Sequence, residues 1–419
     1  MSAASPAPLD RDFDLATIDV ISPIHYERSG YPHAEWRFLR RHHPVFRVER
    51  DVVDYPFWAI TKHADIVDLS KQPDLWLNAP QMAVFTNEMD EIDDPARHLL
   101  NMDPPDHATY RRVASKQFTP RAVKALVPHV VEMTREILDA AAEKEAGDFV
   151  ADVSAPITIG VIADMLGVPP ADRQLLFRWT NEIIAPTDPE FVKGTPRETL
   201  DRARLELFSY FKDMSDDRRK RPRNDIVSVV ANGTVYGRAI PDFELLSYYL
   251  LLVAAGNETT RNAMTGGMIA FLERPGEWEK LRRDPSLLDT AVEEIVRWTS
   301  PVIQFGRTAA RDYVLRGETI RAGEVACLFY PSANRDEEVF PDGDVFRVDR
   351  SPNDHVAFGR GEHVCLGAHL ARLELKTAFA QLRERLEHCE PAGPPERARS
   401  SFVDGIKRAP MRWRIRPSA

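Results

Sequence analysis

The sequence predicts a mainly helical protein with small β-sheets, an α+β fold. Between residues 107 and about 271, apolar side chains recur at helical spacing, and most breaks fall at prolines. Residues 301–345 instead contain short extended runs separated by turns, which is typical of small sheets. A last helix is expected over 368–386, followed by coil rich in proline and glycine and by a final pair of strands.

The N-terminal part of the chain is predicted to be more irregular. Residues 1–20 are rich in alanine, proline and aspartate, and we expect them to be loosely held. A helix is expected at 34–41, and the runs 45–48 and 57–60 predict a small hairpin. Residues 75–103 lack periodicity and predict a long loop, a kind of segment that is often functional in compact proteins.

Length and composition favour one large domain. The chain has 419 residues, of which 43% are hydrophobic, and no repeat or low-complexity linker divides it, so we expect a single domain over 1–419. The formal net charge of −10 argues against nucleic acid or an anionic membrane as a partner. Acidic residues flank the basic run 218–223, so we expect a solvated loop there.

Cysteine content and hydropathy suggest a cytoplasmic protein. The three cysteines, Cys327, Cys365 and Cys389, are too few and too scattered for a disulfide framework, which fits a reducing compartment. The longest apolar stretch, 245–255, is far shorter than the ~20 residues that span a bilayer. The first residues show no signal-peptide pattern, so we expect no membrane anchor.

Cys365 lies in an unusual loop, Phe358-Gly-Arg-Gly-Glu-His-Val-Cys-Leu-Gly367. The glycines allow backbone conformations closed to other residues, and they let the chain approach a flat ligand closely. A helix follows at once, and its N-terminal N–H groups lower the pKa of a nearby thiol. A single thiolate held in this way is an axial ligand for haem iron that favours O–O cleavage. The alternative is a buried structural cysteine beside a glycine turn.

This decapeptide resembles the haem-binding signature of the cytochrome P450 family at each fixed position: Phe358, Gly359, Gly361, His363, Cys365 and Gly367. The resemblance implies the cytochrome P450 fold, with haem b between a long central helix and the cysteine loop. It makes Cys365 the metal ligand, and it makes Phe358, His363 and Gly367 contacts of the cofactor.

A long apolar helix is expected over 241–271, and Ala255-Gly-Asn-Glu-Thr-Thr260 interrupts it. A threonine hydroxyl can bond to the carbonyl four residues earlier and open the helix. A polar surface stripe at a bend is the alternative. The segment resembles the distal acid–alcohol motif of the family. That resemblance implies that Ala255 and Gly256 leave room for O2, that Thr259 holds oxygen and a water, and that Glu258 relays protons from solvent.

Three further charged residues match a structural motif of the family. Glu294 and Arg297 share a helix face because they are three residues apart. Most such pairs are solvated, but this one precedes Cys365 at about the family distance and resembles the family's Glu-x-x-Arg motif, with Arg350 as third partner. A buried charge needs a partner, so we interpret these residues as structural and not catalytic.

The two carboxylates of a haem need cationic or donor partners. His107 and Arg111 are four residues apart and resemble the family's His-x-x-x-Arg pair. Arg307 and His363 also match positions that contact the propionates in the family. Each of these residues taken singly could equally be an ordinary surface residue.

The substrate is expected between the 75–103 loop, the central helix and the extended segment after Arg297. Nearly all candidate wall residues are apolar, which predicts a hydrophobic substrate, although ordinary core packing is as good an explanation for any one of them. The candidates are Met82, Val84, Phe85, Leu251, Ala254, Val302, Ile303, Phe305, Phe402 and Val403. Segments such as AGNETTRNA are similar to those of bacterial relatives that oxidise sterols, terpenes and branched lipids.

No Gly-x-Gly-x-x-Gly follows a predicted strand, so we expect no bound flavin or NAD. The resemblance implies that electrons from NAD(P)H arrive through a separate ferredoxin and ferredoxin reductase. A basic patch of Arg112, Lys116, Arg360 and Arg372 is a candidate docking surface for the ferredoxin, with ordinary solvated charges as the alternative.

These observations predict a monomeric haem-thiolate monooxygenase that inserts one oxygen atom from O2 into a C–H bond of a hydrophobic small molecule, most simply a sterol, a terpenoid or a branched lipid. A peroxide-driven or non-oxygenating cytochrome P450 is one alternative, and the Glu258–Thr259 pair argues against it. A non-catalytic haem sensor is the other, and it would not need that pair or a wide apolar pocket.

Overall fold

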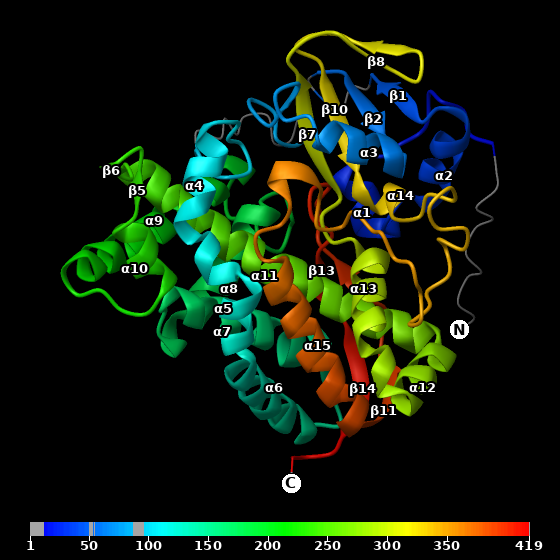
Figure 1. Cartoon of the computed structure of the whole chain (residues 1–419). Helices are drawn as coiled ribbons and strands as arrows, with labels where there is room; N and C mark the ends of the chain where they lie inside the picture. Colours follow the sequence, from blue (N-terminus) through cyan, green and yellow to red (C-terminus); the bar gives the residue numbers. More distant parts are fainter. Residues whose placement is uncertain (1–11, 50–52, 54, 87–95, 419) are drawn as a thin grey trace.

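Helices make up most of the molecule (Figure 1). The computed structural model describes residues 12–49, 53, 55–86 and 96–418. The helices are α1 (Pro23–Ser29), α2 (His33–His42), α3 (His63–Ser70), α4 (Asp106–Ser115), α5 (Pro120–Ala125), α6 (Val127–Ala142), α7 (Ala155–Leu166), α8 (Arg173–Ile184), α9 (Pro196–Lys220), α10 (Ile226–Ala231), α11 (Asp242–Glu273), α12 (Pro275–Arg283), α13 (Leu288–Thr299), α14 (Tyr330–Ala333) and α15 (Ala368–Arg385). The helices predicted at 34–41, 241–271 and 368–386 are thus confirmed as α2, α11 and α15.

The strands form one five-stranded sheet, one three-stranded sheet and three two-stranded ribbons among the described residues. The five-stranded sheet has the order β1-β2-β10-β7-β3, and the three-stranded sheet the order β11-β14-β4. The strands are β1 (Val45–Val48), β2 (Phe57–Ile60), β3 (Trp76–Leu77), β4 (Ala146–Asp148), β5 (Thr234–Val235), β6 (Arg238–Ala239), β7 (Gln304–Ala309), β8 (Tyr313–Leu315), β9 (Glu318–Ile320), β10 (Val325–Phe329), β11 (Leu386–Pro391), β12 (Glu396–Arg397), β13 (Ile406–Arg408) and β14 (Pro410–Ile415). The predicted hairpin is confirmed, because β1 pairs antiparallel with β2 and Val45 faces Ile60.

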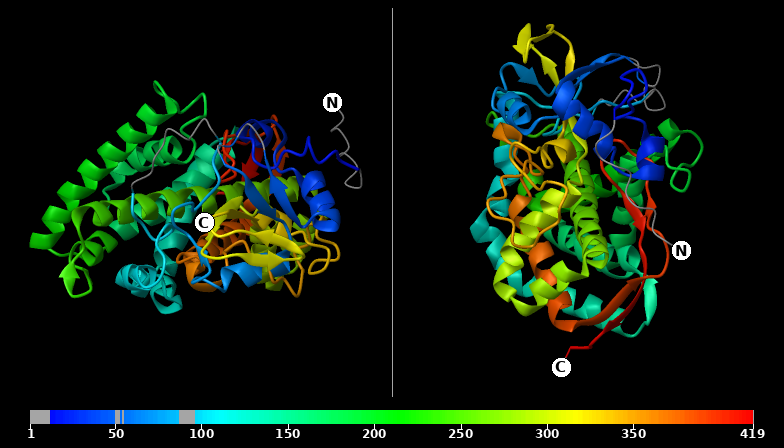
Figure 2. Two further views of the ribbon diagram at one scale, coloured as in Figure 1. Left: turned by 90° about the horizontal axis from the view of Figure 1, so that it is seen from above. Right: turned by 90° about the vertical axis from the view of Figure 1, so that its right-hand side faces the viewer.

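The helix α11 crosses the middle of the molecule and organises the packing around it (Figures 1 and 2). It contacts α7, α8 and α9 as well as α13 and α15. Most of its side chains between Leu245 and Phe271 are buried, so the rest of the protein surrounds it on nearly every face. Figure 2 shows the five-stranded sheet gathered toward one end of the molecule and the helices α8 to α10 toward the other.

The N-terminal segment differs from its prediction. Ile18 is 2% exposed and Val20 1% exposed, and both pack in the same apolar cluster as Trp36 and Phe57. The expectation of a loosely held segment is therefore wrong for these residues, because their apolar side chains cover the sheet. Residues 1–11 lie outside the described part of the chain, as do residues 87–95 of the long loop.

The prediction of a solvated loop at 218–223 is wrong for its first three residues, whereas residues 221–223 are exposed and lie outside any helix. Helix α9 continues through Lys220, and basic side chains in a last helical turn interact favourably with the helix dipole. Arg218 is buried, and its Nε donates to Asp225 Oδ2 at 2.7 Å. Across the described ranges, no helix combines the length and the apolar character that crossing a bilayer requires.

Candidate active site

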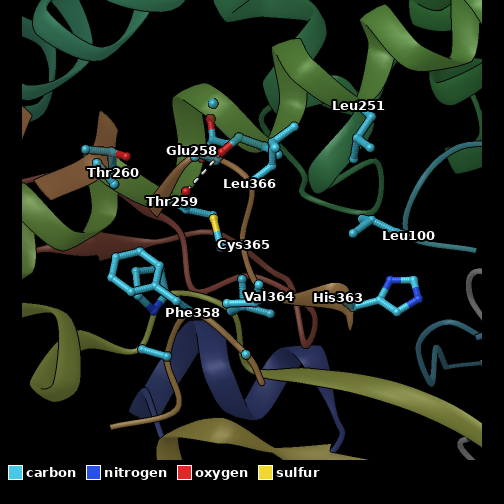
Figure 3. Close-up of a pocket in the computed structure, with 18 of the residues that line it drawn as sticks. Leu100, Leu251, Glu258, Thr259, Thr260, Phe358, His363, Val364, Cys365 and Leu366 are labelled. Atoms are coloured by element: carbon cyan, nitrogen blue, oxygen red, sulfur yellow. Dashed lines mark hydrogen bonds between the residues drawn. The ribbon is translucent and has the colours of Figure 1, made fainter. Parts of the chain in front are cut away.

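A large cavity separates α11 from the loop that carries Cys365 (Figure 3). Its empty space is about 1770 Å³ when the open solvent at its mouth is included. The wall includes Leu251, Ala254, Glu258 and Thr259 from α11. These positions follow helical spacing and share one face of α11. Residues of α11 and of the cysteine loop therefore face one shared space.

The cysteine loop is shaped by two glycines with positive φ. Gly359 and Gly361 both have φ of +71°, and a Cβ on Gly361 would lie 1.9 Å from the carbonyl oxygen of Ser70. The loop is closed by a hydrogen bond from the Cys365 N–H to the Phe358 carbonyl at 2.8 Å. The loop therefore holds one sulfur in place and brings the backbone against α3 more closely than any side chain would allow.

The Cys365 side chain is open to the cavity, although protein surrounds it on the other sides. Burial raises the pKa of the thiol, and the Gly367 N–H and the Arg111 guanidinium oppose that rise. The sequence predicted a lowered pKa, and this prediction is wrong for the surroundings that the protein provides, because desolvation of the thiolate outweighs the effect of the helix terminus. A metal ion deprotonates a coordinating thiol outright.

The acid–alcohol pair lies on α11 at the cavity. The Thr259 hydroxyl donates to the Ala255 carbonyl oxygen at 3.0 Å, which is the back-bond expected from the sequence. Glu258 is buried, and burial raises the pKa of its carboxyl while Arg261 opposes that effect. Ala255 and Gly256 also line the cavity, and a Cβ on Gly256 would lie 2.9 Å from the Ile162 side chain of α7. The glycine therefore allows close packing of α7 on α11.

The four residues matched to propionate contacts all line the cavity. The rings of His107 and His363 stack with centroids 3.8 Å apart, and Arg111 Nη2 donates to the Val364 carbonyl at 2.6 Å. Burial, reinforced by Arg111, lowers the pKa of His107 to about 4. Burial and the neighbouring His107 lower the pKa of His363 to about 2.

These residues fit a haem. His107 is buried, and neither of its ring nitrogens has a hydrogen-bond partner within the described ranges. The guanidinium of Arg307 is buried beside them, and burial lowers its pKa. Buried cations and orphaned donors suit anionic partners such as propionates, and a lone sulfur on the cavity wall suits iron. Asn78, which sequence reasoning missed, also lines the cavity with its Nδ2 2.8 Å from His363 Nε2.

Glu294, Arg297 and Arg350 form one buried ion cluster away from the cavity. Arg297 donates twice to the Glu294 carboxylate, at 2.7 and 2.8 Å, and Arg350 Nε donates to Glu294 Oε2 at 3.0 Å. Arg297 also donates to the carbonyl oxygens of Asn334 and Gly343. The cluster therefore ties α13 to the segment before the cysteine loop.

The predicted substrate walls are only partly on the cavity. The residues that line it are Leu251, Ala254, Val302, Phe305, Phe402 and Val403. Ile303 and Val84 do not, because both are fully buried in the N-terminal apolar cluster. Met82 and Phe85 are not on its wall either; the Met82 carbonyl accepts from the Gly306 N–H, and the Phe85 ring packs on Phe402 with centroids 5.7 Å apart. Sequence reasoning missed the wall residues Leu99, Leu100 and Ile184, which carry no motif.

The candidate basic patch is more neutral than its sequence suggests. Arg372 makes two hydrogen bonds to Glu293, at 2.6 and 2.8 Å, and its guanidinium lies 4.5 Å from the Phe358 ring centroid. Arg360 pairs with Asp354. Arg112 and Lys116 are exposed and remain the better candidates for docking.

A cysteine loop lies opposite a helix that carries an acid and a hydroxyl, with histidine and arginine side chains on the same cavity, and this is the arrangement expected of a haem-thiolate oxidoreductase. Residues 195–409 match the family model described as Cytochrome P450. A steroid C26-monooxygenase of Mycolicibacterium smegmatis is 38% identical over 410 residues, which cover 96% of this chain and 93% of that protein. A methyl-branched lipid omega-hydroxylase of Mycobacterium tuberculosis is 35% identical over 375 residues, covering 88% and 87%.

Solved structures agree with these relatives. The Mycobacterium marinum cytochrome P450 in complex with pseudoionone superposes with a TM-score of 0.89 at 34% identity, covering 96% of this chain and 99% of that one. The Bacillus megaterium protein CYP109E1 in complex with testosterone superposes with a TM-score of 0.81 at 32% identity, covering 93% and 99%. The chain belongs to the cytochrome P450 family and is an oxidoreductase of the monooxygenase type, and membership implies a haem cofactor.

Proposed function

We propose that this chain binds haem b and inserts one oxygen atom from O2 into a C–H bond of a hydrophobic small molecule. The observation that carries the proposal is the meeting of Cys365, Glu258 and Thr259 on the wall of one cavity. A thiolate ligand alone would serve a sensor, whereas a carboxylic acid and a hydroxyl facing the same space serve proton delivery to oxygen.

Bound haem would supply the activation of O2, and the residues of the chain bind it and manage protons. Cys365 would ligate the iron, with Phe358 and Gly367 against the cofactor. His107, Arg111, Arg307 and His363 would hold the propionates. The Thr259 hydroxyl, placed by its bond to Ala255, would orient oxygen and a water beside Gly256, and the Glu258 carboxyl would pass on protons that come from solvent.

The substrate class that we propose is a sterol, a terpenoid or a methyl-branched lipid. The cavity wall beyond the acid–alcohol pair is apolar, with Leu99, Leu251, Ile184 and Phe402 among its residues. The relatives named above act on steroids and methyl-branched lipids, and the structural neighbours contain testosterone and pseudoionone. An extended apolar molecule is common to all of these.

We further propose that the protein acts as a cytoplasmic monomer without bound flavin or NAD. Electrons would come from NAD(P)H through a separate ferredoxin reductase and ferredoxin. All three cysteines are free thiols, as expected in a reducing compartment. The exposed Arg112 and Lys116 would suit an acidic ferredoxin.

The test is turnover of the haem-loaded protein with ferredoxin, reductase, NAD(P)H and isotope-labelled O2, on a panel of sterols, terpenes and branched fatty acids chosen by haem spectral shifts. We expect one labelled oxygen atom in the product. A peroxide-driven enzyme would form product with H2O2 and not with the ferredoxin system, and a sensor would form none. A ferrous carbonyl spectrum typical of nitrogen ligation would refute the role of Cys365, whose replacement in Cys365→His should produce that spectrum.

A further inference from the structure

Helix α11 carries a second buried charge next to the proposed proton-relay acid. Arg261 is 2% exposed, and its Nη2 donates to Glu258 Oε2. Its Nη1 donates to Asn181 Oδ1 at 3.4 Å, and its guanidinium carbon lies 5.4 Å from the centroid of the Phe177 ring. Asn181 and Phe177 are four residues apart on α8, so both belong to the same face of that helix.

Arg261 is the only cation paired with Glu258 across residues 12–49, 53, 55–86 and 96–418. A carboxylate without a partner in such surroundings would be neutralised, because burial strongly disfavours an isolated charge. The arginine has a pKa far above neutrality, so it stays protonated while the carboxyl gains and loses its proton. The positive charge that favours the carboxylate form of Glu258 is therefore that of Arg261, one turn further along α11.

The pairing uses only one of the two carboxylate oxygens. Oε2 is held by Arg261, whereas Oε1 is buried without a hydrogen-bond partner within the described part of the chain. The Glu258 side chain borders the cavity, and the Asn262 side chain is a further polar group that acts on its carboxyl. Arg261 thereby anchors one of the two carboxylate oxygens.

Helix α8 connects this pair to the substrate space. Ile184 at the end of α8 lines the cavity, while Asn181 and Phe177 contact Arg261. A molecule that contacts Ile184 in the cavity therefore contacts the same helix that positions the Arg261 guanidinium. The Glu258 carboxylate thus contacts the Arg261 guanidinium, which in turn contacts α8.

We propose that Arg261 is a positioning residue for Glu258. It offsets the cost of burying the carboxylate and anchors its Oε2, and α8 sets the place of the guanidinium through Asn181 and Phe177. The inference rests on the proposed role of Glu258 in proton delivery.

The experiment compares the wild type with Arg261→Gln, both as haem-loaded full chains, by infrared spectroscopy and by product formed per NAD(P)H. In Arg261→Gln we expect an additional C=O band of a protonated carboxyl, beyond any band that the wild type shows from other buried carboxyls such as Glu374. We also expect product per NAD(P)H to fall about ten-fold or more, with peroxide released instead. Arg261→Lys should restore most of the product yield and remove the band, because it keeps the charge. Asn181→Leu should lower the yield by a smaller factor.

Glu258→Gln/Arg261→Gln removes both charges, so it should fold even if the single variant does not, and it should lack the new band. Arg218→Gln is a matched control: Arg218 is another buried arginine in an ion pair, with Asp225, and it is not on the cavity wall. It should leave the yield and the carboxyl region unchanged.

The results separate the two proposals. If Glu258→Gln formed as much product and as little peroxide as the wild type, the role of Glu258 itself would be refuted. Loss of coupling in Glu258→Gln together with a normal yield and no new band in Arg261→Gln would overturn the inference about Arg261 alone.

Discussion

Thr259 lies on the cavity wall, and its hydroxyl donates a hydrogen bond to the backbone of its own helix. Its bond to the Ala255 carbonyl at 3.0 Å sets the side-chain rotamer, and the hydroxyl oxygen can still accept from a water. We expect Thr259→Ala to consume NAD(P)H at a similar rate but to release peroxide in place of most of the product. Product, peroxide and NAD(P)H measured together test this.

Thr265→Ala is the matched control for this prediction. Thr265 is a buried threonine on the same helix that bonds Ser154 Oγ at 2.8 Å and is not on the cavity wall. Its loss should cost about 1 kcal/mol of stability and leave coupling unchanged. Equal coupling in Thr259→Ala and the wild type would contradict the role given to Thr259.

Glu374 of α15 is a buried carboxyl at the cavity whose Oε2 has no partner in the described part of the chain. Burial raises its pKa well above the ordinary value. The folded state therefore holds the proton more tightly than the unfolded state, whose glutamate pKa is about 4.3. Its contribution to stability is fully present below that value and is lost as pH rises toward the folded pKa.

Glu374→Gln cannot ionise, so the variant should gain stability relative to the wild type as pH increases from 5 to 8. The Tm of both haem-loaded proteins over this range is the measurement. Glu136→Gln changes an exposed glutamate of α6 in the same way and should show no such trend. A constant Tm difference across the range would contradict a raised pKa for Glu374.

At the scale of elements, α13 is held to the segment before the cysteine loop by Glu294, Arg297 and Arg350. Both Glu294 and Arg297 have fully buried side chains. The arginine also donates to the carbonyl oxygens of Asn334 and Gly343, so these two buried backbone groups are satisfied by the same side chain. The cluster therefore fixes the path of the segment that leads to the cysteine loop.

Arg297→Ala should therefore cost about 3–5 kcal/mol, because it leaves the Glu294 carboxylate buried with a single cation. We expect much less folded, haem-loaded protein, measured by haem absorbance per soluble protein and by denaturant unfolding. Arg282→Ala on α12 removes an arginine from a surface pair with Glu279 and should cost less than about 1 kcal/mol. Similar losses in both variants would show that the cluster has no special structural role.

At the scale of the whole molecule, the net charge is −10. An acidic partner would be repelled by such a protein, so its docking requires a local cluster of basic residues on the surface. Within the candidate patch, Arg360 and Arg372 are paired with acids, whereas Arg112 and Lys116 are exposed. Docking of ferredoxin should therefore depend mainly on the latter two.

Reduction of the haem-loaded protein by an acidic ferredoxin should slow as salt increases, because ions screen the steering charges. Arg112→Glu/Lys116→Glu should lower the reduction rate by about ten-fold at low salt and much less at high salt. Stopped-flow measurements across NaCl concentrations test this, with Arg282→Glu as a single charge reversal on α12. A rate that does not depend on salt or on these residues would place the docking surface elsewhere.

Local patterns were sufficient for much of the fold and of the candidate site. The helix α11 follows from helical spacing, whereas its cavity residues Glu258 and Thr259 follow from the resemblance to the family's acid–alcohol motif. The glycines of the cysteine loop have the positive φ values that their residue type suggests. Predictions of substrate-wall residues failed where adjacent residues lie in different surroundings. Val302 borders the cavity while Ile303 faces the core, because successive side chains of an extended segment point to opposite sides.

By itself, the sequence determined the elements and the chemical groups, since helical periodicity, glycine conformations and a lone thiol are properties of a few adjacent residues. Only the tertiary structure decided the environment of each group. Arg218 is buried where it pairs with Asp225, and the pKa of Cys365 is raised because the protein around the cavity desolvates the thiolate. Burial and pairing depend on residues distant in the chain, so charge and access at the cavity could not be read from local spacing.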